Sequence, residues 1–131
     1  MIGLDTNILV RYLAQDDPVQ SPLAADIIEI RLTEANPGFI STVAMVETVW
    51  VLGRAYDLRD REIAAALERV LQADTLVVEN EQEVFTATMA LKGGRGSFAD
   101  ALIGPLGSRA GCTRALTFDK TALRLPGIEF P

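Results

Sequence analysis

The sequence predicts an α/β fold with a mostly parallel central sheet and helices on both faces of that sheet. Three observations support this prediction. Short apolar segments alternate along the chain with longer amphipathic segments. Buried parallel strands typically form such apolar runs, and they need helical crossovers between them. The 131 residues contain no linker, repeat or low-complexity tract, so we expect a single domain over residues 1–131.

The short apolar segments are the expected strands. One opens the chain, and the later ones follow turn residues or the end of an amphipathic segment. In chain order we expect strands at residues 1–4, 39–41, 76–78, 115–118 and 128–130. The first and fourth of these are followed at once by an aspartate, which places a carboxylate at the carboxyl end of each strand.

The amphipathic segments between the strands predict six helices. Asn80 followed three residues later by Glu83 has the pattern of a capping box, and Asp60 is expected to cap the helix that follows it. An Asp-Pro step and an Asn-Pro-Gly turn separate early elements. The first expected helix covers residues 8–13, with Thr6 or Asn7 as its cap. The others cover 21–35, 42–56, 60–73, 80–91 and a segment that begins at Ser97.

Composition limits the chemistry that this chain can perform. The chain has no histidine, which excludes a Ser-His triad and an imidazole base. The one cysteine, Cys112, excludes an internal disulfide and a cysteine-built zinc site. We find no run of about 18 apolar residues that predicts a membrane span, and no secretory signal pattern, so we expect a cytoplasmic protein. A net charge of −6 argues only weakly against nucleic acid, since clustered carboxylates neutralised by metal would supply much of it.

Four isolated acidic residues interrupt or end apolar segments: Asp5, Glu47, Asp100 and Asp119. A lone buried carboxylate is costly unless something pairs with it. Ligands of parallel sheets bind beyond the carboxyl ends of the strands, where Asp5 and Asp119 are expected. Helices that start there would bring Glu47 and Asp100 to the same edge. The pattern therefore predicts one acidic site, and carboxylates in a histidine-free chain favour Mg²⁺ or Mn²⁺.

Each of these acids also has a structural interpretation. Asp5 could cap the first helix, and Asp100 could complete a capping box with Ser97. Glu47 could face solvent, and Asp119 could be a turn residue. Capping does not require four segments to meet, whereas a metal site does. Three polar residues are expected to orient the acidic ligands: Thr6, Asn7 and Thr117.

Four blocks of the sequence resemble, in order and spacing, the PIN-domain family, and specifically VapC-type toxins of type II toxin–antitoxin systems. The first block is LDTNILVRYL at residues 4–13, and the second runs from Ile-Ser at 40–41 through Val-Glu at 46–47 to Trp-Val-Leu at 50–52. The third is FADALI at 98–103, and the fourth is TFDK at 117–120, leading into LPGI at 125–128. Ser97 stands where many members carry an acidic residue.

The resemblance implies a PIN-like fold and a metal-dependent ribonuclease. It implies that the four acids form the catalytic, metal-binding site, with Asp5 and Asp100 holding the principal Mg²⁺ or Mn²⁺. The ion would activate a water for phosphodiester hydrolysis. It also implies a homodimer and a cognate antitoxin, which we expect to present Arg or Lys to the acids. Candidate contacts to the RNA substrate are Arg11, Lys92 and Arg95, the last two beside the Gly-rich segment at 93–96.

Other functions stay open at the level of sequence. A housekeeping RNA-processing PIN nuclease would share the chemistry without the toxin role. A non-catalytic PIN module would bind RNA or protein without cutting. A phospho-acceptor signalling domain would need adjacent acids after its first strand, but Thr6 follows Asp5 here. Trp50 is interpreted as a core or dimer-interface residue rather than a platform for base stacking.

Overall fold

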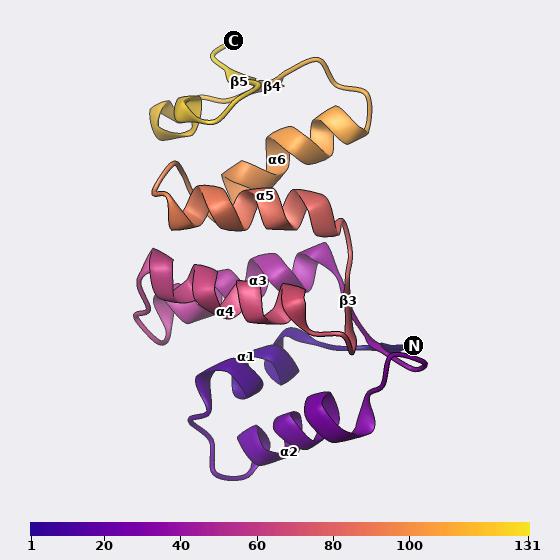
Figure 1. The fold of residues 1–131 in the computed structure, drawn as a ribbon. Helices are drawn as coiled ribbons and strands as arrows, with labels where there is room; N and C mark the ends of the chain where they lie inside the picture. Colours follow the sequence, from indigo (N-terminus) through magenta and orange to yellow (C-terminus); the bar gives the residue numbers. More distant parts are fainter.

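The computed structural model describes residues 1–131 as a stack of helices, with a three-stranded parallel sheet along one side and a two-stranded parallel pair at one end (Figure 1). In chain order the elements are β1 (Ile2–Gly3), α1 (Thr6–Ala14), α2 (Gln20–Asp26), η1 (Ile27–Arg31), β2 (Gly38–Ile40), α3 (Thr42–Arg54), α4 (Asp60–Gln72), β3 (Leu76–Val78), α5 (Glu81–Lys92), α6 (Phe98–Arg109), β4 (Ala115–Leu116), η2 (Lys120–Arg124) and β5 (Ile128–Glu129). The alternation of strands and helices confirms the predicted α/β class. No helix is long and apolar enough to cross a membrane.

The first three strands form a parallel sheet in the order β1-β2-β3. Its register aligns Ile2 with Gly38 and Gly38 with Leu76. The ladder continues past β1, because the Leu4 amide donates to the Phe39 carbonyl at 2.9 Å. The sheet face that carries Leu4, Ile40 and Val78 is buried, whereas Val77 on the opposite face is 42% exposed. Packing of one face against the helices therefore stabilises this sheet, while its other face is partly exposed.

The last two strands form a separate parallel pair rather than extending the first sheet. In β4 and β5, Ala115 aligns with Ile128 and Leu116 with Glu129. Figure 1 shows this pair beyond α6, at the end of the helical stack opposite α2. The 3₁₀ turn η2 lies between the two strands, and the sequence did not predict it. One edge of β1 and one edge of β4 consequently carry no neighbouring strand.

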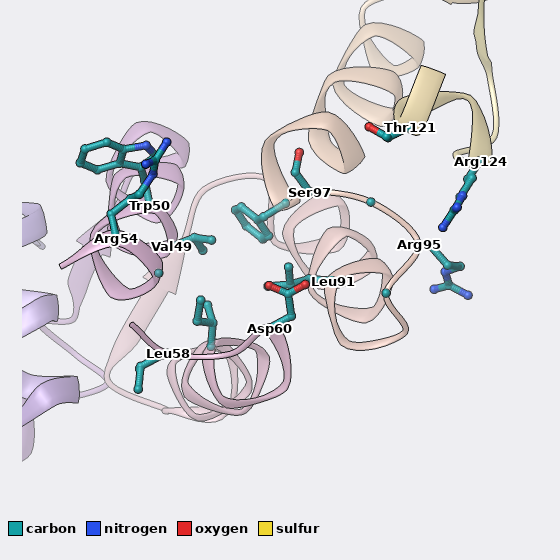
Figure 2. Close-up of a pocket in the computed structure, with 15 residues that line it drawn as sticks. Val49, Trp50, Arg54, Leu58, Asp60, Leu91, Arg95, Ser97, Thr121 and Arg124 are labelled. Carbon is teal, nitrogen blue, oxygen red and sulfur yellow. The ribbon is translucent and has the colours of Figure 1, made fainter. Parts of the chain in front are cut away.

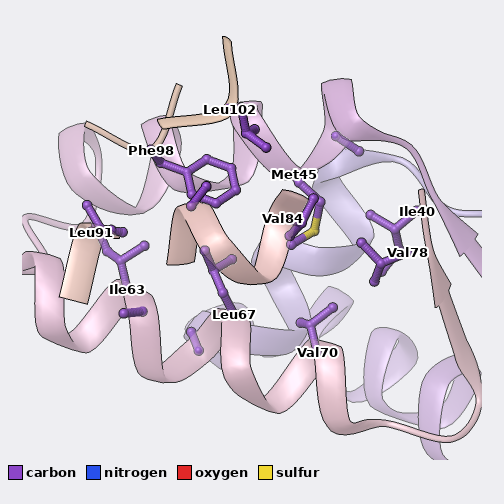
Figure 3. Close-up of a cluster of buried hydrophobic side chains, with 14 of the residues drawn as sticks. Ile40, Met45, Ile63, Leu67, Val70, Val78, Val84, Leu91, Phe98 and Leu102 are labelled. Carbon is purple, nitrogen blue, oxygen red and sulfur yellow. The ribbon is translucent and has the colours of Figure 1, made fainter. Parts of the chain in front are cut away.

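The hydrophobic core lies between α3, α4, α5 and α6, against the buried face of the first sheet. Figure 3 shows Met45, Leu67 and Phe98 converging there from three different helices. All three are at most 2% exposed. Full burial of such a side chain contributes about 1.5–3 kcal/mol. The core therefore holds in place α3, which carries Glu47, and the first turn of α6, which carries Asp100.

Two local predictions were wrong at helix boundaries. The helix expected over 21–35 ends at Arg31 with a π-helical turn, η1. Leu32 then turns to extended backbone and is 3% exposed. Its side chain packs on β2 so closely that a Cβ added to Gly38 would lie 2.7 Å from Leu32 Cδ1. Burial of Leu32 thus ends the helix early.

The capping box expected at Asn80 and Glu83 is also absent. Asn80 adopts a left-handed conformation with φ 54° and makes no cap hydrogen bond. Its Nδ2 donates instead to Thr42 Oγ1 at 3.0 Å, and Glu83 pairs with Arg109 at 2.8 Å. The cap of α4 is Arg59 rather than Asp60, with Glu62 Oε1 accepting from the Arg59 amide. At Asn80 and Glu83, hydrogen bonding to residues of other elements therefore replaces the expected capping box.

Candidate functional site

Asp5 and Glu47 lie near each other because the start of α1 is bonded to α3. Thr6, which is 7% exposed, donates its hydroxyl to Glu47 Oε1 at 3.1 Å. Asp5 immediately precedes Thr6 and occupies the N-cap position of α1, with extended backbone at φ −80° and ψ 160°. Its side chain makes no cap hydrogen bond. The capping interpretation of Asp5 is therefore wrong, and its exposed carboxylate stays available to an external group.

Asp100 projects from the first turn of α6 and is half-buried. Ser97 is the N-cap of this helix, and its Oγ accepts from the Asp100 amide at 3.1 Å. Only half of the expected capping box forms, since the Asp100 carboxylate makes no hydrogen bond and no ion pair within the molecule. Ser97 thus supplies the cap, and Asp100 is not needed for it. The positive end of the helix dipole favours an anion at this position.

Asp119 is engaged by its own turn. It is the N-cap of η2, and its Oδ1 accepts from the Thr121 hydroxyl at 2.7 Å and from the Thr121 amide at 2.9 Å. These two bonds, the hydroxyl first, hold the pKa of Asp119 below its usual value. Thr117 Oγ1 accepts from the Asp119 amide at 3.0 Å. The turn interpretation of Asp119 is confirmed.

The four acids do not meet in this conformation. No three Asp, Glu or Cys side chains lie close enough together to hold a metal ion. Convergence of all four required β4 to lie beside β1, but β4 pairs only with β5. Asp5, Glu47 and Asp119 are exposed, so the expected cost of burying a carboxylate does not apply to them. The donor chemistry suits a hard cation, whereas the arrangement does not assemble a complete ligand set. The metal-binding role of these residues stays a prediction.

The remaining predicted site residues are Asn7, which was expected to orient the acids, and three expected RNA contacts. Asn7 is exposed in the first turn of α1. Among the expected RNA contacts, Arg11 donates to Asp16 at 3.3 Å, to Gln20 at 2.8 Å and to Tyr56 at 2.9 Å. Lys92 forms an ion pair with Glu68 at 3.0 Å. Arg95 alone has neither a hydrogen bond nor an ion pair to another side chain, so it is the cation best placed to meet a ligand.

A pocket of about 640 Å³ opens between α3, α4, the α5–α6 connection and η2 (Figure 2). Arg54, Arg95 and Arg124 line it, together with Trp50. Trp50 is 63% exposed, so it is not a core residue, and its alternative interpretation as a dimer-interface residue stays a prediction. From the sequence, Arg54 and Arg124 are two of eight cations available to contact phosphates, and nothing in the pattern groups them with Arg95. The spacing of four between Trp50 and Arg54 on a predicted helix was the available signal, because it places both on one face.

Comparison with known proteins adds one finding. The family model described as PIN domain matches residues 2–128 of the chain. This match covers both sheets and all the candidate acids. No curated protein matches the chain.

Proposed function

The chain belongs to the PIN-domain family, and on this premise we propose that it is a metal-dependent endoribonuclease acting as the toxin of a type II toxin–antitoxin pair. PIN domains are generally nucleases that act on nucleic acid and use divalent metal ions such as Mg²⁺. The choice of RNA, the internal position of the cut and the toxin role are our proposals. They rest on the order and spacing of the four sequence blocks.

The observation that carries the proposal is the state of the acidic side chains. The carboxylates of Asp5 and Asp100 accept no hydrogen bond and form no ion pair within the molecule. Glu47 is held by one hydroxyl, that of Thr6. Carboxylates without internal partners at the starts of helices are suitable ligands for Mg²⁺ or Mn²⁺. We therefore assign the principal metal-binding role to Asp5 and Asp100. Glu47 and Asp119, which have internal hydrogen bonds, are assigned to the same catalytic site from the order and spacing of the sequence blocks.

Cleavage of total cellular RNA by the purified protein tests this assignment. We expect discrete fragments in Mg²⁺ or Mn²⁺ and none in EDTA. Asp5→Asn should reduce the rate by more than the roughly 10- to 100-fold that loss of an outer partner of a metal ligand costs. Asp74→Asn is the matched control, because Asp74 is an exposed aspartate in the loop before β3 and has no ion pair. Equal rates in the two variants would remove Asp5 from the site.

A second candidate is a PIN module that binds without cutting. The observation that favours it is the separation of the acids, since no three of them gather in this conformation. Folded protein that neither cleaves RNA nor binds Mn²⁺ in calorimetry would establish this function. Metal-dependent cleavage of one precursor RNA, with no effect on cell growth, would instead establish a housekeeping nuclease.

The toxin role requires partners. We propose a cognate antitoxin that presents Arg or Lys to the exposed carboxylates, and a homodimer of this chain. Exposed apolar side chains such as Val43 and Ile103 provide surface that a partner chain could cover. Co-purification with the product of a small neighbouring reading frame tests the first, and light scattering tests the second. An antitoxin that binds equally well after all four acids are neutralised would contradict the electrostatic account.

A further inference from the structure

The pocket beside α3 has two walls of different chemistry. Figure 2 shows Trp50 and Arg54 on one side and Arg95 and Arg124 on the other. Apolar side chains, including Leu91 and Phe98, form part of the lining between these walls. Its volume of about 640 Å³ lies within the range of roughly 300–1,000 Å³ that is typical of small-ligand sites. The pocket can therefore accommodate part of a ligand that is both flat and charged.

The cations that line the pocket are uncommitted. The chain has 12 lysines and arginines, and six of them form ion pairs with carboxylates: Arg11, Arg31, Arg59, Lys92, Arg109 and Arg114. Arg54, Arg95 and Arg124 have no such partner, and all three line this one pocket. Asp60 is the single acidic side chain of the lining. A protein with a net charge of −6 thus concentrates free positive charge here, which points to an anionic ligand.

Trp50 adds an aromatic surface to this charge. The Arg54 guanidinium lies over the Trp50 ring, 5.8 Å from its centroid. With 63% of its surface exposed, the indole is available to stack on a flat partner. Bases of single-stranded nucleic acid stack on aromatic and guanidinium planes, whereas paired bases inside a duplex do not reach them. An acidic peptide would use the arginines but would leave the ring unoccupied.

The pocket also adjoins the candidate acidic site. Ser97, which caps the helix of Asp100, lines it, and so does Thr121, which bonds Asp119. On α3, Trp50 and Arg54 follow Glu47 at helical spacing, so the same face of the helix leads from the acid to the pocket. Arg95 borders both this pocket and a neighbouring one that Asp100 lines.

We propose that this pocket binds the single-stranded stretch of the RNA substrate beside the bond to be cut. Arg54, Arg95 and Arg124 contact its phosphates, and an unpaired base stacks on Trp50. The inference rests on the proposed function, because it takes RNA as the substrate. It adds that recognition requires an unpaired segment and that binding does not require the metal.

Intrinsic fluorescence in EDTA tests the inference directly, because Trp50 is the only tryptophan of the chain. Titration of the full-length protein with an oligouridine should quench this emission in a saturable manner. The same oligouridine in a duplex with oligoadenylate should not. The binding constant K of the fluorescein-labelled strand, measured by anisotropy, then compares the variants. In Arg95→Ala and in Arg124→Ala, the slope of log K against log salt concentration should become shallower by about 0.7.

Matched variants separate charge from stacking. Arg69→Ala is the charge control, since Arg69 is also exposed and unpaired but lies on α4 outside the pocket. It should bind the labelled strand like the unmodified chain. Trp50→Ala should weaken binding by about 5- to 150-fold, the range that one stacked base contributes, and Trp50→Phe should restore much of the loss. Circular dichroism confirms the fold of each variant.

The possible results distinguish this inference from the proposed function. Failure of the oligouridine to bind in EDTA overturns the inference. The inference is also overturned if the oligouridine binds without changing the Trp50 emission and if Arg69→Ala loses as much affinity for it as Arg95→Ala. Quenching by a polyglutamate peptide but not by RNA would assign the pocket to an acidic protein and would also overturn it. Metal-dependent cleavage of total RNA, measured in parallel, would in each of these cases still support the ribonuclease.

Discussion

In the three-stranded sheet, Leu4, Ile40 and Val78 are at most 8% exposed, whereas in the β4–β5 part of the chain Phe118 is 87% exposed. The first sheet is stabilised by side chains that pack against the helices. The second has one buried side chain within its strands, that of Ile128, and its ladder is extended at the ends by hydrogen bonds from Ala115 to Gly127 and from Thr117 to Glu129. The two parallel sheets of the molecule therefore differ in how much buried apolar surface stabilises them.

This difference divides the candidate site. Asp5 and Glu47 project from elements fixed by the main core, and the hydroxyl of buried Thr6 joins them. Asp119 projects from a segment with fewer buried side chains, since only Ala122, Leu125 and Ile128 of residues 115–131 are buried in the core. Its own turn orients it. Regions with few buried contacts open most readily. A site precise enough for catalysis needs its groups on rigid elements. The C-terminal segment is thus the less rigid half of the site.

The largest expected effect separates the two regions by stability. Phe98→Ala removes a ring that is 2% exposed in the main core and should lower the free energy of unfolding by about 3–5 kcal/mol. Phe118→Ala is the matched substitution in the C-terminal segment and should change it by no more than about 0.5 kcal/mol. Urea denaturation followed by circular dichroism measures both. Similar losses in the two variants would show that Phe118 is buried in solution and would contradict the contrast between the two regions.

The next prediction concerns the hydrogen bond from the Thr6 hydroxyl to Glu47. Thr6→Val keeps the shape of the side chain but removes the hydroxyl that orients Glu47. If Glu47 binds metal, the rate of RNA cleavage should fall by about 10- to 100-fold, as it does when other metal ligands lose an outer partner. The free energy of unfolding should change by only about 1 kcal/mol.

Thr48→Val is the control for this substitution. Thr48 is fully buried on the same helix as Glu47, but its hydroxyl donates to the Ala44 carbonyl at 2.7 Å, away from any acid. Its cleavage rate should match that of the unmodified protein. A rate that falls equally in both variants would mean that the loss follows from a general weakening of α3, and the role of Thr6 would be refuted.

The sequence was sufficient to predict most of the architecture. Apolar runs located all five strands, and the helix at 60–73 matched α4 to within one residue. Ser97 was correctly expected to start α6, since a serine N-cap acts on its own next turn. These features depend on interactions within a few residues, which a single sequence displays.

The failures share the opposite property. Asn80 bonds to Thr42, 38 residues away, and Glu83 pairs with Arg109, 26 residues away. Neither partner is visible from the local pattern. The four acids are also not gathered in this structure, since their convergence depends on which strand lies beside β1. Their assignment to one site stays a prediction. The exposure of Trp50 could not be predicted from the apolar run that contains it either. The run predicts a helix, but it does not show which side of that helix other elements cover.

The smallest expected effect concerns the turn that engages Asp119. Its pKa lies below the ordinary aspartate value of about 3.9 because the Thr121 hydroxyl, and then the Thr121 amide, donate to the carboxylate. A carboxyl whose pKa is lowered by folding stabilises the folded state above the unfolded pKa. That stabilisation is lost as the pH falls through the lower, folded value. The affected window is therefore the acidic range below about pH 3.9.

Thr121→Val removes the stronger of the two donors and retains the amide. The pKa of Asp119 should therefore rise part of the way toward its ordinary value, and the turn should lose its stabilisation at a higher pH. Carbon-detected NMR of the side-chain carboxyl measures the titration. Asp17 is an internal reference, because its lowered pKa comes chiefly from the backbone amides of Gln20 and Val19, which the substitution does not touch. An unchanged Asp119 titration beside a constant Asp17 would mean that the hydroxyl bond does not persist in solution. The carboxylate of Asp119 would then be held by the Thr121 amide alone, and the contrast with the unbonded carboxylate of Asp5 would narrow.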